Sequence, residues 1–198
     1  MPSFKTIQPN TGSIHVIDGD PLDKAGAAVA PASGEIVTKH VQFGPFCQTT
    51  LTLNNVPQAV VNGTEYQGTK IYDFPQGRLL VMGVTATLQQ KTTSAIASTL
   101  NSGTGAISLG TATASSTTLD STMADLLPST AFTSSTVINV AGTAVSGALA
   151  VSAQFDGTTT AKDVYLNTAY ATTTDVDADA TQTISGTVVI TWCQLGDY

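Results

Sequence analysis

The chain has 198 residues, of which 41% are hydrophobic and 11% are charged, and its formal net charge is −7. The hydrophobic share excludes a wholly disordered chain, and the length is sufficient for one substantial core. The seven Lys and Arg residues are scattered through this acidic sequence, which argues against a nucleic-acid partner.

Residues 1–34 are interrupted by proline and glycine and contain one short extended piece at 13–17. We interpret them as an extended N-terminal arm in front of a β-rich body at 35–198. Ordering a residue costs about 1–2 kcal/mol, which an isolated extended segment does not offset. The arm is therefore expected to lie on a neighbouring subunit or the shell, or else along its own body.

Two strands are predicted after the arm, at 35–43 and 48–53, because apolar and polar residues alternate there. Gly44 and Pro45 predict the turn between these strands. Asn54, Asn55 and Pro57 then predict a loop that ends the second strand.

The longest alternation spans 79–88 and predicts a strand in the middle of a sheet. Pro75 and Gly77 predict a turn before it, so that 66–73 lies antiparallel to 79–88. The last predicted strand, 183–192, is the next most regular. Inward positions of these two strands give the predicted core: Leu80, Met82, Val84, Val188, Ile190 and Trp192.

A loop rich in Ser, Thr and Ala is predicted at 92–104, and the remaining predicted strands are 107–114, 137–141, 145–155 and 163–172. One short helix is predicted at 118–128, where Thr118 is placed to cap it and Leu119, Met123, Leu126 and Leu127 recur at helical spacing. The pattern predicts an all-β fold: a jelly-roll-like β-sandwich of about eight strands with one short helix and an extended N-terminal arm.

Candidate catalytic and metal-binding residues are few. The two histidines, His15 and His40, do not have the spacing of paired metal ligands, and no serine lies in a G-x-S-x-G elbow. We therefore predict that the chain is not an enzyme and that it holds no cofactor and no metal.

Residues 1–10 lack the basic region and apolar core of a secretory signal, and no run approaches the about 18 apolar residues of a membrane helix. We expect a soluble protein that is made in the cytoplasm and has no membrane partner. In that reducing compartment, buried free thiols are favoured over a disulfide for Cys47 and Cys193.

Asp175, Asp177 and Asp179 alternate in the manner of the first three ligands of a calcium loop. Such a loop continues with Gly and Glu at positions where this chain has Ala180 and Gly186, so a solvated acidic loop is the favoured interpretation. Asp73 and Arg78 flank the Pro75 turn and are placed to form an exposed ion pair worth about 0–1 kcal/mol.

Four segments follow one another along the chain, at 70–80, 114–128, 164–172 and 183–192. The stretch after the first of them is rich in Thr and Ala. The order of these segments resembles that of the jelly-roll capsid decoration (cement) proteins of tailed bacteriophages, and the resemblance covers about 35–198. It implies a non-enzymatic virion protein that binds the outer surface of a phage head and stabilises the capsid. The partners it implies are the major capsid protein and the chain itself, commonly as a homotrimer at local threefold positions.

A surface rich in Thr, Ser and Ala fits that role because it loses little side-chain entropy in an interface. One alternative is a carbohydrate-binding β-sandwich. Such binders usually expose aromatic side chains, whereas Trp192 alternates with the core positions. Another alternative is a tail or fibre structural subunit, which composition and periodicity do not distinguish from a head protein.

Overall fold

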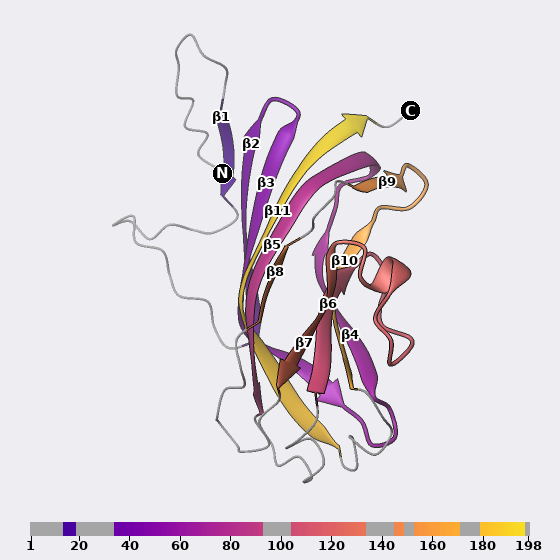
Figure 1. The fold of residues 1–198 in the computed structure, drawn as a ribbon. Helices are drawn as coiled ribbons and strands as arrows, with labels where there is room; N and C mark the ends of the chain where they lie inside the picture. Colours follow the sequence, from indigo (N-terminus) through magenta and orange to yellow (C-terminus); the bar gives the residue numbers. More distant parts are fainter. Residues whose placement is uncertain are drawn as a thin grey trace, which may run out of the picture.

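A computed structural model describes residues 14–18, 34–92, 104–133, 145–148, 153–170 and 179–196. These residues form eleven strands in two antiparallel sheets, which pack face to face as a jelly-roll-like β-sandwich (Figure 1). The predicted all-β fold is confirmed. Most of the arm, most of the predicted 92–104 loop and the predicted strand at 137–141 lie outside the described residues, and the division at residue 34 stays a prediction.

The larger sheet has seven strands in the order β1-β2-β3-β11-β5-β8, with β9 also beside β5. Its strands are β1 (Ile14–Asp18), β2 (Glu35–Phe43), β3 (Phe46–Val60), β5 (Gly77–Thr92), β8 (Val145–Ala148), β9 (Ala153–Gly157) and β11 (Ala180–Gly196). The smaller sheet has four strands in the order β4-β10-β6-β7. They are β4 (Tyr66–Asp73), β6 (Thr104–Gly110), β7 (Leu127–Thr133) and β10 (Asp163–Tyr170).

β11 lies between β3 and β5 and pairs with both along most of its length. Its inward side chains are among the most deeply buried of the molecule, as the alternation predicted: Ile184, Val188, Ile190 and Trp192. The prediction for 163–172 is also confirmed, since Val164, Leu166 and Tyr170 of β10 enter the same core.

The extended piece predicted in the arm corresponds to β1. It pairs antiparallel with β2 of the same chain, with Ile14 opposite Phe43. This part of the arm therefore lies along its own body.

The predicted hairpin between 66–73 and 79–88 is wrong. β4 belongs to the smaller sheet, where it pairs with β10, and β5 belongs to the larger one. Phe74 explains the change of sheet: its ring is buried between the sheets against Trp192, and its N–H donates to the Lys162 carbonyl. The turn at Pro75 is a corner between layers.

Two members of the predicted core are wrong. Leu80 is half-buried and Met82 is 36% exposed, whereas Leu79 and Val81 are buried. The register shifts between Val81 and Gly83, so a β-bulge at Met82 reverses the alternation inside β5. From Val84 onward the predicted inward face is correct.

The predicted loop after residue 53 is a second bulge, and β3 continues to Val60. Asn55 adopts a positive φ of 50°, and its N–H donates to the Ser185 hydroxyl on β11 over 2.9 Å. Pro57 is tolerated in the strand because β2 begins opposite Asn54, so that no described strand pairs with this edge of β3 at Pro57.

The predicted helix at 118–128 is wrong, because the segment contains a single 3-10 turn, η2 (Ser121–Met123). The four apolar residues do not share a face. Leu119 and Met123 pack with Ala114 and Ala169 in a small cluster, while Leu126 and Leu127 join the core between the sheets. The loop around η2 covers the outer face of the smaller sheet (Figure 1).

One predicted strand differs in extent. The strand predicted at 107–114 is β6, which begins at Thr104 and ends at Gly110. The described parts of the strand predicted at 145–155 are β8 and β9, which pair antiparallel with successive parts of β5, and residues 149–152 lie outside the described residues.

Candidate interaction surface

In the described part of the chain, no three His, Cys, Asp or Glu side chains gather closely enough to hold a metal ion. His40 lies in the core margin beside Trp192, with ring centroids 5.6 Å apart, and burial lowers the pKa of its imidazole. His15 lies on β1, a strand for which the structure describes the backbone alone. Among the described helices, none is long and apolar enough to span a bilayer.

Cys47 and Cys193 are buried free thiols, as predicted. Cys47 lies opposite Trp192 on β3 and points into the core, whereas Cys193 follows Trp192 and points to the other face of the sheet. Side chains on opposite faces cannot meet the geometry of a disulfide. Burial, with a smaller contribution from Cys193, raises the pKa of the Cys47 thiol.

The predicted acidic loop at 175–179 lies mostly outside the described residues. Asp175 and Asp177 lie outside them, and Asp179 accepts a hydrogen bond from the Asn62 N–H over 2.8 Å. The predicted pair of Asp73 with Arg78 is replaced by a pair with Lys70 at 2.5 Å. Arg78 instead lies opposite Asp156 on β9.

The outer face of the larger sheet is lined by hydroxyl groups. Its three central strands contain no charged residue over 46–54 of β3, 79–90 of β5 and 183–195 of β11, in a chain of net charge −7. Outward positions of these strands are occupied mainly by threonine: Thr50, Thr52, Thr85, Thr87, Thr187 and Thr191. The smaller sheet covers only the opposite face (Figure 1).

At one end of this outer face the threonines give way to apolar side chains. Phe43, Phe46, Cys193, Leu80 and Gln154 are consecutive partners across β2, β3, β11, β5 and β9. We define the distal apolar patch as the exposed or half-buried side chains around the buried Cys193: Phe43, Phe46, Leu80, Met82 and Leu195. Exposed contiguous apolar surface of this kind marks interaction sites.

The most exposed part of the patch is the hairpin tip, residues 43–46, between β2 and β3. Its two rings, Phe43 and Phe46, are 55% and 49% exposed. Gly44 takes the positive φ of 59° that the tight turn requires. The tip is held by its neighbours, since the Gln42 amide donates to the Gly44 carbonyl over 3.0 Å and the Gln194 N–H donates to the Pro45 carbonyl.

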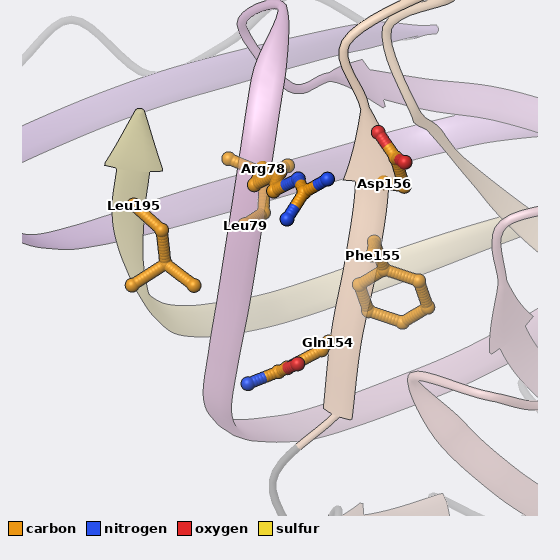
Figure 2. A pocket seen from close by; sticks show the side chains of 6 residues that line it. All are labelled: Arg78, Leu79, Gln154, Phe155, Asp156 and Leu195. Carbon is orange, nitrogen blue, oxygen red and sulfur yellow. The ribbon is translucent and has the colours of Figure 1, made fainter. Parts of the chain in front are cut away.

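An open hollow of about 540 Å³ lies at the other margin of the same end, and Figure 2 shows the side chains around it. β5, β9 and the end of β11 supply its lining: Arg78, Leu79, Gln154, Phe155, Asp156 and Leu195. Hydrogen bonds from Thr158, with a smaller effect of Arg78, lower the pKa of the Asp156 carboxyl. The hollow therefore combines a cation, an anion and an apolar wall, an arrangement suited to binding.

A buried polar layer at the other end of the core was not predicted. Gln58 of β3 lies opposite Gln182 of β11, and both are fully buried. The Tyr170 hydroxyl donates to the Gln182 side-chain carbonyl, and burial raises the pKa of Tyr170, so this phenol stays a donor. The signal was present in the sequence, because both glutamines occupy inward positions of alternating strands.

No family model and no curated protein sequence matches this chain. A chain in the structure of infectious bursal disease virus, Gx strain, is similar over 98% of this chain, with 11% identical residues and a TM-score of 0.27. The alignment covers 56% of that chain, so this chain spans little more than half its length. At this TM-score the similarity carries no weight for family or function.

Proposed function

We propose that the chain is a structural virion protein that binds the outer surface of a phage head and stabilises the shell, as a decoration protein does. The uncharged central part of the outer face of the larger sheet carries this proposal. A sheet face without a charged residue over 46–54, 79–90 and 183–195 is uncommon on an acidic protein, because exposed uncharged sheets tend to associate. A partner that covers this part of the face in the assembled particle explains why it carries no charge.

The chemistry of this face suits attachment to a large, ordered surface. A threonine side chain has few rotamers, so immobilising many threonines in an interface costs less entropy than immobilising Lys or Glu side chains. Threonine hydroxyl groups are both donors and acceptors of hydrogen bonds and can match a varied polar surface. The resemblance of 35–198 to decoration proteins points to the major capsid protein as the partner and to three copies of the chain at each attachment site.

The test uses heads assembled without this protein. Purified chain is mixed with them, bound protein is measured by co-sedimentation, and heat resistance is measured as the temperature at which packaged DNA is released. We expect saturable binding and a higher release temperature. Absence of binding to heads overturns the proposal, and binding to isolated tails instead identifies a tail or fibre subunit.

Two variants locate the contact. Thr85→Lys with Thr187→Lys places two charges at exposed positions of the outer face, and we expect binding to heads to weaken at least about tenfold. Thr117→Lys, on the exposed loop that covers the smaller sheet, is the matched control and should bind normally. Equal binding by all three proteins would assign the contact to another surface.

A version that starts at Gly34 tests the arm. It lacks β1, the edge strand that pairs with β2, while the two-sheet core remains. We expect it to fold and to bind heads more weakly than the full chain. Equal binding would remove the arm from attachment. Binding of a glycan in place of heads would favour the carbohydrate-binding alternative, with the polar groups of the hollow as its first candidate site.

A further inference from the structure

We propose that the hairpin tip of one copy of this chain, with Phe43 and Phe46, binds in the hollow of a second copy, so that copies join head to tail. This contact would join copies of the proposed decoration protein to one another. That three copies join rests on the proposed function. The contact itself is argued from the two surfaces alone.

The hollow selects an aromatic occupant. Arg78 is the single arginine of the chain, it is exposed, and no ion pair within 4 Å engages it among the described residues. A guanidinium beside the exposed apolar side chain of Leu195 favours a ring that packs against this side chain and presents its face to the cation. A volume of about 540 Å³ is within the range that encloses a small organic ligand, about 300–1,000 Å³.

The chain itself carries the matching group. The large exposed apolar side chains of the described residues are Phe43, Phe46, Val61, Met82 and Leu195, and the two aromatic ones among them are both on the hairpin tip. The tip has no charge and is held in place by Gln42 and Gln194, so little order has to be gained on binding. Aromatic anchors that fill a partner's pocket are the usual centres of protein interfaces.

The tip does not reach the hollow of its own copy. Phe46 and Gln154 lie in one row across the sheet but are three strand steps apart, through Cys193 and Leu80. At about 4.8 Å per step, this separation is roughly 14 Å. Tip and hollow thus occupy opposite margins of the same end of the larger sheet, where a second copy set beside the first brings one to the other.

This arrangement has a consequence for assembly. Because the two surfaces differ, the contact is heterologous, and its repetition closes into a ring or grows into a filament. Three copies related by a threefold axis would use three identical contacts. This is the trimer expected of a decoration protein.

A cross-linking experiment tests the contact in the full chain. Phe43→Cys and Gln154→Cys are prepared as separate single variants, mixed and oxidised with oxidised glutathione, which accepts the two electrons as each disulfide forms. Phe43 is chosen because Phe46 lies directly opposite Cys193, where a new cysteine would form a disulfide within one chain. The native thiols Cys47 and Cys193 are buried, and any dimer that they form in each single variant gives the background level. We expect a disulfide-linked dimer in the mixture at least about tenfold more abundant than in either variant alone. Predominant dimers of Phe43→Cys alone would show a symmetric contact and overturn the proposal.

Sedimentation velocity without heads gives a second readout. We expect the double variant Phe43→Ser, Phe46→Ser and the single variant Arg78→Gln to raise the dissociation constant of self-association at least about tenfold. Val61→Ser, at the far end of β3 and 50% exposed, is the matched control and should leave it unchanged. Unchanged self-association in the tip and Arg78 variants, with circular dichroism of the wild type, would overturn the proposal.

These readouts separate the two proposals. A chain that binds heads but forms no disulfide between tip and hollow overturns this contact and leaves the proposed function intact. A chain that forms the disulfide but ignores heads keeps the contact and removes the decoration function.

Discussion

Trp192 donates its indole N–H to the hydroxyl of Thr49 over 3.0 Å, which joins β11 to β3 by side chains inside the core. The same indole packs edge-on against Phe74, with ring centroids 5.5 Å apart. Phe74 belongs to the corner where the chain passes from one sheet to the other. Trp192 therefore fastens the larger sheet to this corner.

Truncating Trp192 should be strongly destabilising. We expect Trp192→Ala to lower the free energy of unfolding by about 3–5 kcal/mol, because it leaves a cavity between the sheets and removes one of the hydrogen bonds to Thr49. Urea unfolding followed by circular dichroism measures the change. Leu195→Ala, on the same strand but exposed, is the control and should change it by less than about 1 kcal/mol. A neutral Trp192→Ala would contradict the role assigned to this side chain.

His40 predicts a pH dependence of stability. Burial lowers the pKa of this imidazole from its ordinary 6.5, so in the folded chain it takes up a proton only at lower pH. Between the two pKa values the unfolded chain binds more protons, and the free energy of unfolding falls as the pH falls through about 6.5. Above about pH 7.5 His40 contributes no pH dependence.

The measurement compares wild type with His40→Gln by urea unfolding from about pH 8 to about pH 5. The carboxyl groups titrate in both proteins, so the difference between the two curves reports His40. We expect the wild type to lose more stability on acidification. Parallel curves over this range would contradict the prediction.

Gln58 is expected to be replaceable with a gain in stability. It is fully buried, and neither its Nε2 nor its Oε1 has a hydrogen-bond partner in the described part of the chain. An unsatisfied buried polar group costs about 1–3 kcal/mol, so Gln58→Leu should raise the free energy of unfolding by about 1 kcal/mol or more. Gln48→Leu, exposed on the same strand, should have little effect. A destabilised Gln58→Leu would indicate that Gln58 binds water.

Asn167 should hold the loop over the smaller sheet. Its Oδ1 accepts from the Ala114 N–H at 2.8 Å, and its Nδ2 donates to the carbonyls of Ala112 and Met123, both at 2.9 Å. Asn167→Ala leaves the Ala114 N–H and the Ala112 carbonyl without this partner, and should cost at least about 2 kcal/mol. Hydrogen exchange at Ala114 should rise more than exchange in β11. Ser108→Ala, which removes one hydrogen bond to Met123, should have a smaller effect.

The regular parts of the fold were predictable because burial follows alternation. β2 has the predicted bounds, and β10 and β11 have the predicted inward faces. The errors in predicted burial fall at β-bulges. One extra residue there moves the following side chains to the opposite face of the sheet, and the composition of the strand does not reveal it. Met82 in β5 and Asn55 in β3 are both of this kind, and both bulges lie where β11 pairs with its neighbour.

Partner choice between strands was not predictable from local pattern. Tyr66–Asp73 and the strand that follows Pro75 are adjacent in sequence, yet the burial of Phe74 between the sheets decides that they separate. The candidate surface was missed for a related reason. Phe43 ends the alternation predicted at 35–43 and Phe46 falls between two predicted strands, and only the register across the sheet places the two exposed rings together.

β11 is the last strand in chain order and the middle strand of the larger sheet. During synthesis, β3 and β5 therefore leave the ribosome well before the strand that separates them, and each has an unpaired edge until residues 180–196 emerge. These two strands contain no charged residue over 46–54 and 79–90 to discourage pairing with other chains. Nascent chains on one messenger are thus exposed to mutual pairing, and slow translation of the last part of the message would lengthen that exposure.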